Sequence, residues 1–188
     1  MSRSKQKTDA EVLDALLPAI LEIGLDRVTL KELGEVVGLS PATLVQRFGS
    51  RIAVIEAALD RSTLALERAL QHPEAPGEDP REALITWLAE LAAPLSERRR
   101  LVGTLEVLGR DIVVPERNQR ARHHLGLVRL RIERGLTAMG VPPDAAHCHA
   151  AAVEAQWHGL VLQWALHGEG ALDAWLRRGL HSLLAHLP

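Results

Sequence analysis

The stretch from residue 29 to residue 51 constrains the fold of this chain most strongly, because it holds two consecutive sets of helix start and stop signals. Thr29 can cap a first short helix, and Glu32, three positions later, can complete a capping box. Gly38 then supplies a residue that tolerates the left-handed conformation at a helix end. The same signals recur for a second helix as a cap, a first-position proline and a terminal glycine: Ser40, Pro41 and Gly49. Two short helices joined by a turn that contains glycine predict a helix-turn-helix.

The second predicted helix has two different faces. At about 100° per residue, Leu44 and Phe48 share one side, and Ala42 and Gln46 share the opposite side. An apolar pair beneath a small, amide-bearing face is typical of a helix that lies in a major groove. No acidic residue occurs over residues 36–55, so DNA phosphates would meet no repulsion there. The alternative interpretation is an ordinary helix pair within a helical bundle.

Residues 8–59 resemble the N-terminal domain of TetR-family transcriptional regulators. The matching positions follow the family's order of glycine, capped second helix, turn, recognition helix and entry to the fourth helix: Gly24, Thr29 with Leu33, Gly38-Leu39-Ser40, Thr43-Leu44 and Phe48-Gly49-Ser50-Arg51. The chain departs from the pattern at Val45, where members usually carry a tyrosine that contacts the DNA backbone, and at Arg47, where histidine is common. The resemblance implies a DNA-binding domain over residues 1–58 and a ligand-binding and dimerisation domain over residues 59–188.

The predicted partner is double-stranded DNA with a roughly palindromic operator, because a dimer presents two recognition helices. Gln46 is the expected base reader, since its amide can bond N6 and N7 of adenine together. Thr43 offers a methyl or hydroxyl group beside it, and Val45 lies on the flank of the same face. Pro41 and Ala42 are small enough to let the helix approach the DNA closely. The residues expected to bind phosphate are Thr29, Ser40, Arg47 and Arg51.

Composition narrows the class of protein. In 188 residues, 47% are hydrophobic and 24% are charged, which indicates a globular chain with a sizeable core. A net charge of −2 argues against a nonspecific polycation, and an aromatic content of 3% without tyrosine argues against a base-stacking single-strand binder. The single cysteine, Cys148, fits a reducing compartment. No signal peptide and no long apolar run is present, so we expect a cytoplasmic protein with no membrane contact.

Helical periodicity and breaks in the chain predict an all-α fold of about nine helices. Besides the two short helices, we expect helices over these ranges: 9–24, 51–70, 80–93, 96–110, 116–139, 143–168 and 171–188, with residues 111–115 as a connection. No strand alternation and no internal repeat is evident.

The helix expected over residues 143–168 has two opposed apolar faces. The small face holds Cys148, Ala152, Ala155 and Gly159, and the large face holds Val153, Trp157, Leu160 and Trp164. Such a helix needs two surfaces to bury it, and a partner subunit can supply the second. The last helix, with Leu172, Leu176, Leu180, Leu183 and Leu187, would lie beside it. We therefore expect a homodimer through these two helices, the eighth and the ninth, as in the family, although the sequence leaves open which face meets the partner.

The second predicted domain carries more apolar side chains than three short helices need. They are Leu84, Trp87, Leu88 and Leu91 in one helix and Leu105 and Leu108 in the next. The family places its effector in this domain, so the resemblance implies that Trp87, Leu88, Leu91, Leu105 and Leu108 bind a small apolar or amphipathic molecule, and that the protein is a repressor released by it. The first alternative is that these residues are plain core. The second is a lipid or small-molecule carrier that has the same fold and a non-functional DNA head.

Enzymatic and metal-binding functions have little support. His147, Glu154 and His158 share one helix face, but no third ligand stands at metal-binding spacing, so a solvated strip is the simpler interpretation. Cys148 lies in a row of small residues and has no evident base. We expect no enzyme, no cofactor and no metal.

At the start of the sequence, three basic residues occur without an acidic neighbour: Arg3, Lys5 and Lys7. They form either a frayed terminus or an arm that touches DNA.

Overall fold

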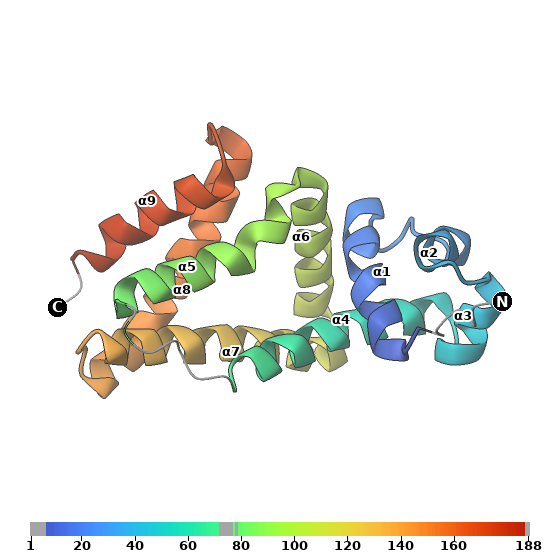
Figure 1. Cartoon of the computed structure of the whole chain (residues 1–188), viewed down its shortest axis with the longest axis horizontal. Coiled ribbons are helices and arrows are strands. Elements are labelled where there is room, and N and C mark those ends of the chain that lie inside the picture. Colours follow the sequence, from blue (N-terminus) through green and yellow to red (C-terminus); the bar gives the residue numbers. More distant parts are fainter. Residues whose placement is uncertain (1–6, 72–76, 78, 187–188) are drawn as a thin grey trace. The chain divides into compact units, whose positions relative to one another are not determined.

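The computed structural model describes residues 7–71, 77 and 79–186, and over these residues the protein is helical with no strand (Figure 1). The α-helices are α1 (Asp9–Ile23), α2 (Leu30–Val37), α3 (Pro41–Phe48), α4 (Arg51–Ala69), α5 (Pro80–Ala92), α6 (Arg98–Val113), α7 (Pro115–Ala138), α8 (Pro143–His167) and α9 (Leu172–Leu184), with a 3₁₀ turn η1 (Ala93–Ser96) after α5. The predicted all-α fold is confirmed, and the described part of the chain holds nine α-helices. None of its helices combines the length and the apolar character needed to cross a membrane.

The helices form two compact units that are discontinuous in sequence. Unit 1 comprises residues 1–68 and 99–121, and unit 2 comprises residues 69–98 and 122–188. This division differs from the predicted boundary after residue 58, because α6 and the first turns of α7 pack with the N-terminal helices. The functional division into a DNA-binding and a ligand-binding domain therefore stays a prediction.

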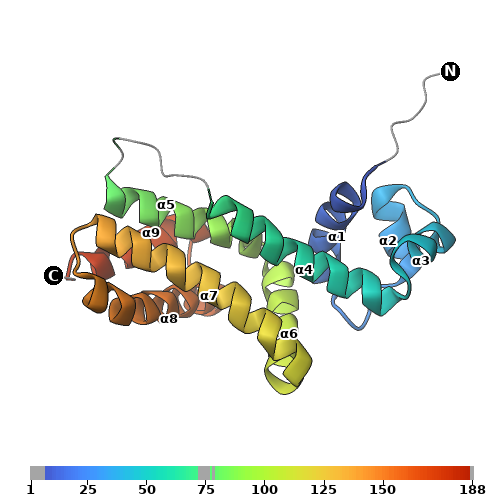
Figure 2. The same cartoon turned by 90° about the horizontal axis from the view of Figure 1, so that it is seen from below.

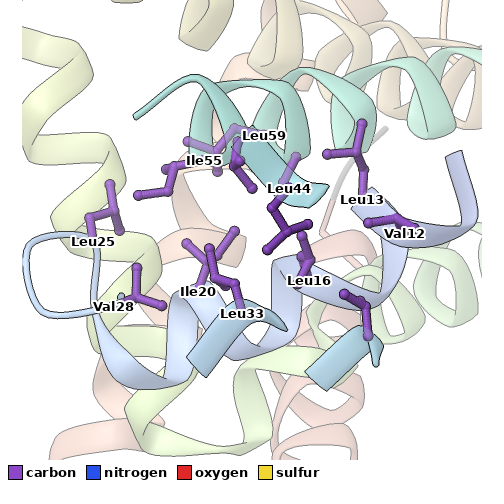
Figure 3. Packing of buried hydrophobic residues seen from close by; sticks show 13 residues of the cluster. Val12, Leu13, Leu16, Ile20, Leu25, Val28, Leu33, Leu44, Ile55 and Leu59 are labelled. Carbon is purple, nitrogen blue, oxygen red and sulfur yellow. The ribbon is translucent and has the colours of Figure 1, made fainter. Parts of the chain in front are cut away.

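The core of unit 1 lies where α1, α2, α3 and the first half of α4 meet. Leu16 and Ile20 of α1, Leu33 of α2 and Leu44 of α3 are completely buried there, and Ile55 of α4 is almost completely buried (Figure 3). Side chains at three- and four-residue spacing on each helix point into this cluster, as the sequence periodicity predicts. The apolar core thus fixes the short helices α2 and α3, which are too short to be stable alone.

Helix α6 lies directly against α1 (Figure 1). A Cβ atom at Gly103 would stand 2.0 Å from the carbonyl oxygen of Leu21, so only glycine permits this approach. Arg110 forms an ion pair with Asp26, and Arg100, near the start of α6, pairs with Glu22 of α1 over 3.6 Å. The backbone contact and the two ion pairs attach α6 to the N-terminal helices.

An ion-pair cluster connects α4, α6 and α7 within unit 1. Nη2 of Arg120 lies 2.8 and 3.1 Å from the two carboxylate oxygens of Asp111, while its Nη1 pairs with Glu56. Arg117 also pairs with Glu56, at 2.8 Å. Burial disfavours the charged guanidinium of Arg120, but its hydrogen bond to Glu56 and the charge of Asp111 outweigh burial and raise its pKa. The sequence placed Asp111 in a connection after residue 110, whereas α6 continues to Val113 and buries it.

Unit 2 contains α5, α8, α9 and most of α7 (Figure 2). Nε1 of Trp157 on α8 donates to the carbonyl oxygen of Leu88 on α5 over 3.0 Å. A Cβ atom at Gly179 of α9 would stand 2.6 Å from Leu160, so α9 packs closely on α8. The buried row of α9 consists of Leu172, Leu176, Leu180 and Leu184. Leu184 thus takes the place predicted for Leu183, and Leu187 lies outside the described residues.

The two faces of α8 have different environments. The large face, with Val153, Trp157, Leu160 and Trp164, is buried as predicted. On the small face Cys148, Ala152 and Ala155 are exposed and Gly159 is half-buried. The face continues toward the end of the helix with Leu162 and Leu166, which are 41% and 75% exposed. Helix α8 therefore carries one apolar face that the described residues leave uncovered.

Candidate nucleic-acid interface

The turn between α2 and α3 depends on two glycines. Gly38 adopts the left-handed conformation, with φ 72° and ψ 33°, and it ends α2 as the sequence predicts. The N–H groups of Gly38 and Leu39 both donate to the carbonyl oxygen of Gly34, the latter over 2.9 Å. A Cβ atom at Gly34 would lie 2.3 Å from the carbonyl oxygen of Leu39. Both positions therefore require glycine for the turn to be this tight.

Helix α3 begins and ends at the predicted residues. The Ser40 hydroxyl accepts a hydrogen bond from the N–H of Thr43 over 3.0 Å, and the two side-chain oxygens lie 2.8 Å apart. Pro41 occupies the first turn, where a missing N–H costs nothing. At the other end Gly49, with φ 93°, donates its N–H to the carbonyl oxygen of Val45. These caps give α3 a defined length of eight residues.

The side chains of α3 divide as the periodicity predicts. Leu44 is completely buried, and Phe48 packs against the same core. Thr43 and Arg47 are half-buried at the sides of the helix. The outward face, which we define by its exposed residues, comprises Pro41, Ala42, Val45 and Gln46. A capped helix that presents a small, amide-bearing face to solvent has the shape and chemistry to enter a major groove.

Thr29 also has its predicted capping geometry. Its side chain accepts the N–H of Glu32, and both its amide and its hydroxyl donate to the Glu32 carboxylate, over 2.8 and 2.7 Å. The hydroxyl bond and then the amide bond of Thr29 lower the pKa of the Glu32 carboxyl. Thr29 remains exposed at the start of α2, beside the Glu32 carboxylate.

Arg47, which the sequence predicts to contact phosphate, makes several contacts within the chain. Its guanidinium forms an ion pair with Asp9 of α1, and its Nη2 donates to the carbonyl oxygen of Lys7 over 3.1 Å. It also lies over the Phe48 ring, 5.4 Å from the centroid. Only 17% of the side chain is exposed. Arg47 thus connects the recognition helix to the start of the chain.

Arg51 also makes hydrogen bonds within the chain. Its Nη1 donates to the carbonyl oxygens of Leu25 and Val28, over 2.7 and 3.1 Å. These two residues belong to the connection between α1 and α2, whose carbonyl groups lack helical partners. The guanidinium of Arg51 therefore stabilises this connection through Nη1, and its phosphate contact stays a prediction.

Two contacts near the start of the described chain were not predicted from the sequence. Thr8 and Glu11 form a capping box on α1, which the spacing of a threonine and a glutamate three residues apart could have revealed. Nζ of Lys7 donates to the carbonyl oxygen of Val37, the last residue of α2, over 3.0 Å. No local pattern predicts that second contact, because the two residues are 30 positions apart.

The residues predicted to bind a small molecule fall into both units. Leu88 is completely buried in unit 2, where Trp87 and Leu91 are half-buried. The guanidinium of Arg131 lies over the Trp87 ring, 5.5 Å from the centroid. Leu105, which is 40% exposed, and Leu108 lie on α6 in unit 1. The ligand-binding role of all five residues remains a prediction.

The polar strip of α8 does not converge on a common point. His147 reaches Glu133 of α7 over 3.2 Å, and Glu154 is buried against Arg129. Nδ1 of His158 lies 2.9 Å from the main-chain oxygen of Glu154 in the preceding turn. Over the described ranges, no three His, Cys, Asp or Glu side chains are grouped so that they could hold a metal ion.

Solved structures of known proteins share this arrangement over nearly their whole length. A TetR regulator from Legionella pneumophila is 13% identical with a TM-score of 0.76, covering 99% of this chain and 100% of its own. A protein assigned as a transcriptional regulator from Saccharomonospora viridis, solved with choline, is 22% identical with a TM-score of 0.72, covering 93% and 94%. A transcriptional regulator from Rhodococcus sp. Rha1 is 25% identical with a TM-score of 0.70, covering 96% and 100%. The chain has the TetR fold. No family model and no curated protein matches its sequence.

The structural likeness confirms the resemblance of residues 8–59 to the TetR family and extends the TetR fold over at least 93% of the chain. Within this fold, α2 and α3 are the helix-turn-helix, and α3 is its second helix. At identities of 13% to 25%, it is the fold that the likeness establishes. The chemistry of the site therefore has to come from the residues of this chain.

Proposed function

We propose that the protein is a sequence-specific DNA-binding transcriptional regulator that uses α3 as its recognition helix. The observation that carries the proposal is the outward face of α3, with Gln46 exposed between defined helix caps and no acidic residue over positions 36–55. Around it, Thr29 and Ser40 stand at two helix N-termini that can receive phosphate. The resemblance to TetR-family regulators favours a repressor that acts in the cytoplasm.

The first prediction concerns base reading by Gln46. Gln46→Ala is expected to cost about 1–3 kcal/mol of affinity for the best operator and to flatten its sequence preference, because a bidentate amide contact to adenine is lost. Fluorescence anisotropy with labelled DNA from upstream of the protein's own coding region measures both effects. Gln119→Ala, an exposed glutamine on α7, is the matched control and should change neither. Unchanged affinity and preference in Gln46→Ala would show that α3 does not read bases.

We also propose a homodimer in which the exposed small face of α8, together with α9, meets its copy. An apolar face that runs along a 25-residue helix is large for the surface of a monomer. Small side chains allow two helix backbones to approach closely, and the large face is already buried in the chain itself. Two recognition helices would then enter successive major grooves, with half-sites about 34 Å apart or slightly more.

The second prediction tests this face. Ala155→Glu is expected to shift the protein from dimer to monomer and to abolish tight operator binding, because it buries an unpaired charge at the interface. Sedimentation velocity at micromolar concentration measures the association state. Ala65→Glu, at an exposed alanine of α4, should leave the dimer intact. A wild-type protein that sediments as a monomer would contradict the proposal.

We propose that unit 2 binds a small effector near Trp87, Leu88 and Leu91, and that the effector favours a conformation unsuited to the operator. The choline complex of a protein with the same fold supports a small-molecule effector of this kind. The apolar side chains of α5 favour an apolar or amphipathic molecule, although a small cation is the other class to test.

The third prediction follows from the position of Trp87. The indole N–H groups of Trp157, Trp164 and Trp175 are all hydrogen-bonded to main-chain oxygens, so replacing them would disturb the fold. Trp87 is therefore the tryptophan to replace. We expect Trp87→Phe to abolish the change in tryptophan emission that a ligand causes in the wild type. Decanoate and choline are the probes, titrated with and without operator DNA. A probe that weakens operator binding but changes emission equally in both proteins would place the site away from Trp87.

A further inference from the structure

The apolar attachment of α3 to the core of unit 1 is narrow. Leu44 is completely buried in the core, and Phe48, one turn later, packs against it (Figure 3). Both side chains lie along one line of the helix, so they constrain rotation of α3 about its axis only weakly. At a radius of about 5–6 Å, a rotation of about 10° moves an outward side chain such as Gln46 by about 1 Å. That movement exceeds the range of hydrogen-bond lengths, so base reading needs a further contact that fixes the rotation.

Arg47 makes a contact of this kind on the side of α3, about 100° around the helix from Gln46 and from Phe48. Its Nε donates to Asp9 over 2.8 Å, and its Nη2 donates both to Asp9 and to the carbonyl oxygen of Lys7. Nη1 is buried, and the guanidinium lies over the Phe48 ring. These contacts enclose the guanidinium, so a DNA phosphate would have to displace the Asp9 carboxylate to reach it.

The partners of Arg47 are themselves held in place. Asp9 is the first residue of α1, and a capping box closes this end of the helix. Nζ of Lys7 donates over 3.0 Å to the carbonyl oxygen of Val37, the last residue of α2. Arg47 therefore connects α3 to a point that is fixed with respect to both α1 and α2.

We propose that Arg47 is the positioning residue of the recognition helix, and that its pairing with Asp9 sets the rotation of α3 at which Gln46 reads bases. The proposal rests on the proposed function and adds to it a residue that acts on base reading through another side chain. A phosphate contact by Arg47 would leave base discrimination unchanged, because phosphate contacts carry no sequence information. The two roles therefore predict different results for the same substitutions.

The substitution Asp9→Asn separates the two roles by the sign of its effect. Asp9 is 65% exposed, so its replacement removes a negative charge that repels phosphate and frees Arg47 to contact one. A phosphate-binding Arg47 would thus bind the operator more tightly in this variant. The positioning role predicts the opposite, a loss of about tenfold in operator affinity, because part of the base contact is lost with the rotation of α3.

The test compares the wild type with Asp9→Asn, Arg47→Met and the double variant. Two duplexes are used, an operator selected with the wild type and the same operator with one base pair changed in each half-site. Each single variant should discriminate between the duplexes about tenfold less well, and the double variant should lose no more than either. Amide hydrogen exchange of the free proteins should be faster in α3 in all three variants.

Asp14→Asn and Arg61→Met are the matched controls. Arg61 of α4 pairs with Asp14 of α1 over 2.9 Å, and the two side chains are 19% and 50% exposed, close to the values for Arg47 and Asp9. This second pair joins α1 to α4 and does not contact α3. Its loss should leave discrimination and exchange in α3 unchanged, and thermal denaturation checks that every variant is folded.

Three results would each overturn the positioning role: tighter operator binding by Asp9→Asn, unchanged discrimination and exchange in Arg47→Met, or additive losses in the double variant. In all three cases the wild type would still prefer its operator, so the proposed function would stand. A wild type that does not discriminate between duplexes would overturn the proposed function and the positioning role together.

Discussion

Replacing Arg120 with methionine is expected to lower the free energy of unfolding by about 3–5 kcal/mol, because it leaves a buried carboxylate without its counterion. Asp111 is 3% exposed, and both of its carboxylate oxygens lie within hydrogen-bonding distance of Arg120. Glu56 would keep Arg117 as its partner, so the loss falls mainly on Asp111. Urea denaturation at neutral pH, followed by circular dichroism, measures the change.

Two further variants separate the buried charge from lost packing. Arg120→Met/Asp111→Leu should recover most of the lost stability, since no buried charge then lacks a partner. Arg61→Met removes an ion pair whose acid, Asp14, is half exposed, and it should change the free energy of unfolding far less than Arg120→Met does. If the single and double variants at Arg120 are equally destabilised, the cluster stabilises the unit through packing and not through charge pairing.

The substitution Gly103→Ala is expected to destabilise the protein by about 3 kcal/mol, at the upper end of the range for overpacking. The new Cβ atom would stand 2.0 Å from the carbonyl oxygen of Leu21, and a backbone atom cannot move aside as a side chain can. Helices α1 and α6 must separate, and α1 supplies much of the core that supports α3. We therefore expect operator binding to weaken together with stability.

Gly109→Ala on the same helix is the control. Nothing lies within 4 Å of a Cβ atom at Gly109, so alanine there should stabilise α6 by up to about 1 kcal/mol through helix propensity alone. Chemical denaturation of the two variants should thus show shifts of opposite sign. Equal shifts for Gly103 and Gly109 would contradict the close approach of α6 to α1.

Local sequence signals predicted the parts of the structure that depend on neighbouring residues. The caps at Thr29 and Ser40, the left-handed Gly38 and the inward position of Leu44 all follow from spacing within one or two helical turns. The two faces of α8 were predicted for the same reason, and the structure adds that the large face is buried and the small face is exposed. Periodicity shows that a helix has two apolar faces, but only the tertiary structure shows which one the chain itself covers.

Contacts between residues distant in sequence could not be predicted in this way. Arg47 donates a hydrogen bond to Asp9, 38 positions away, and Arg51 donates one to Leu25, 26 positions away. Periodicity within a helix does not show that an arginine on its surface has a partner elsewhere in the chain. The burial of Asp111 was not predicted for a related reason. The sequence indicated a connection at that residue, and no neighbouring residue indicates its ion pair with Arg120. The pattern of α3 therefore predicted the outward face, while the contacts that Arg47 and Arg51 make within the chain required the structure.

Selection of binding sites from a pool of random DNA duplexes tests the central claim most directly. The wild-type protein should enrich a palindromic motif with half-sites about one helical turn apart or slightly more. In Gln46→Ala the preference should relax at one position of each half-site while the rest of the motif persists. A folded wild-type dimer that enriches no motif would contradict the account and would favour a small-molecule carrier whose helix-turn-helix does not read DNA.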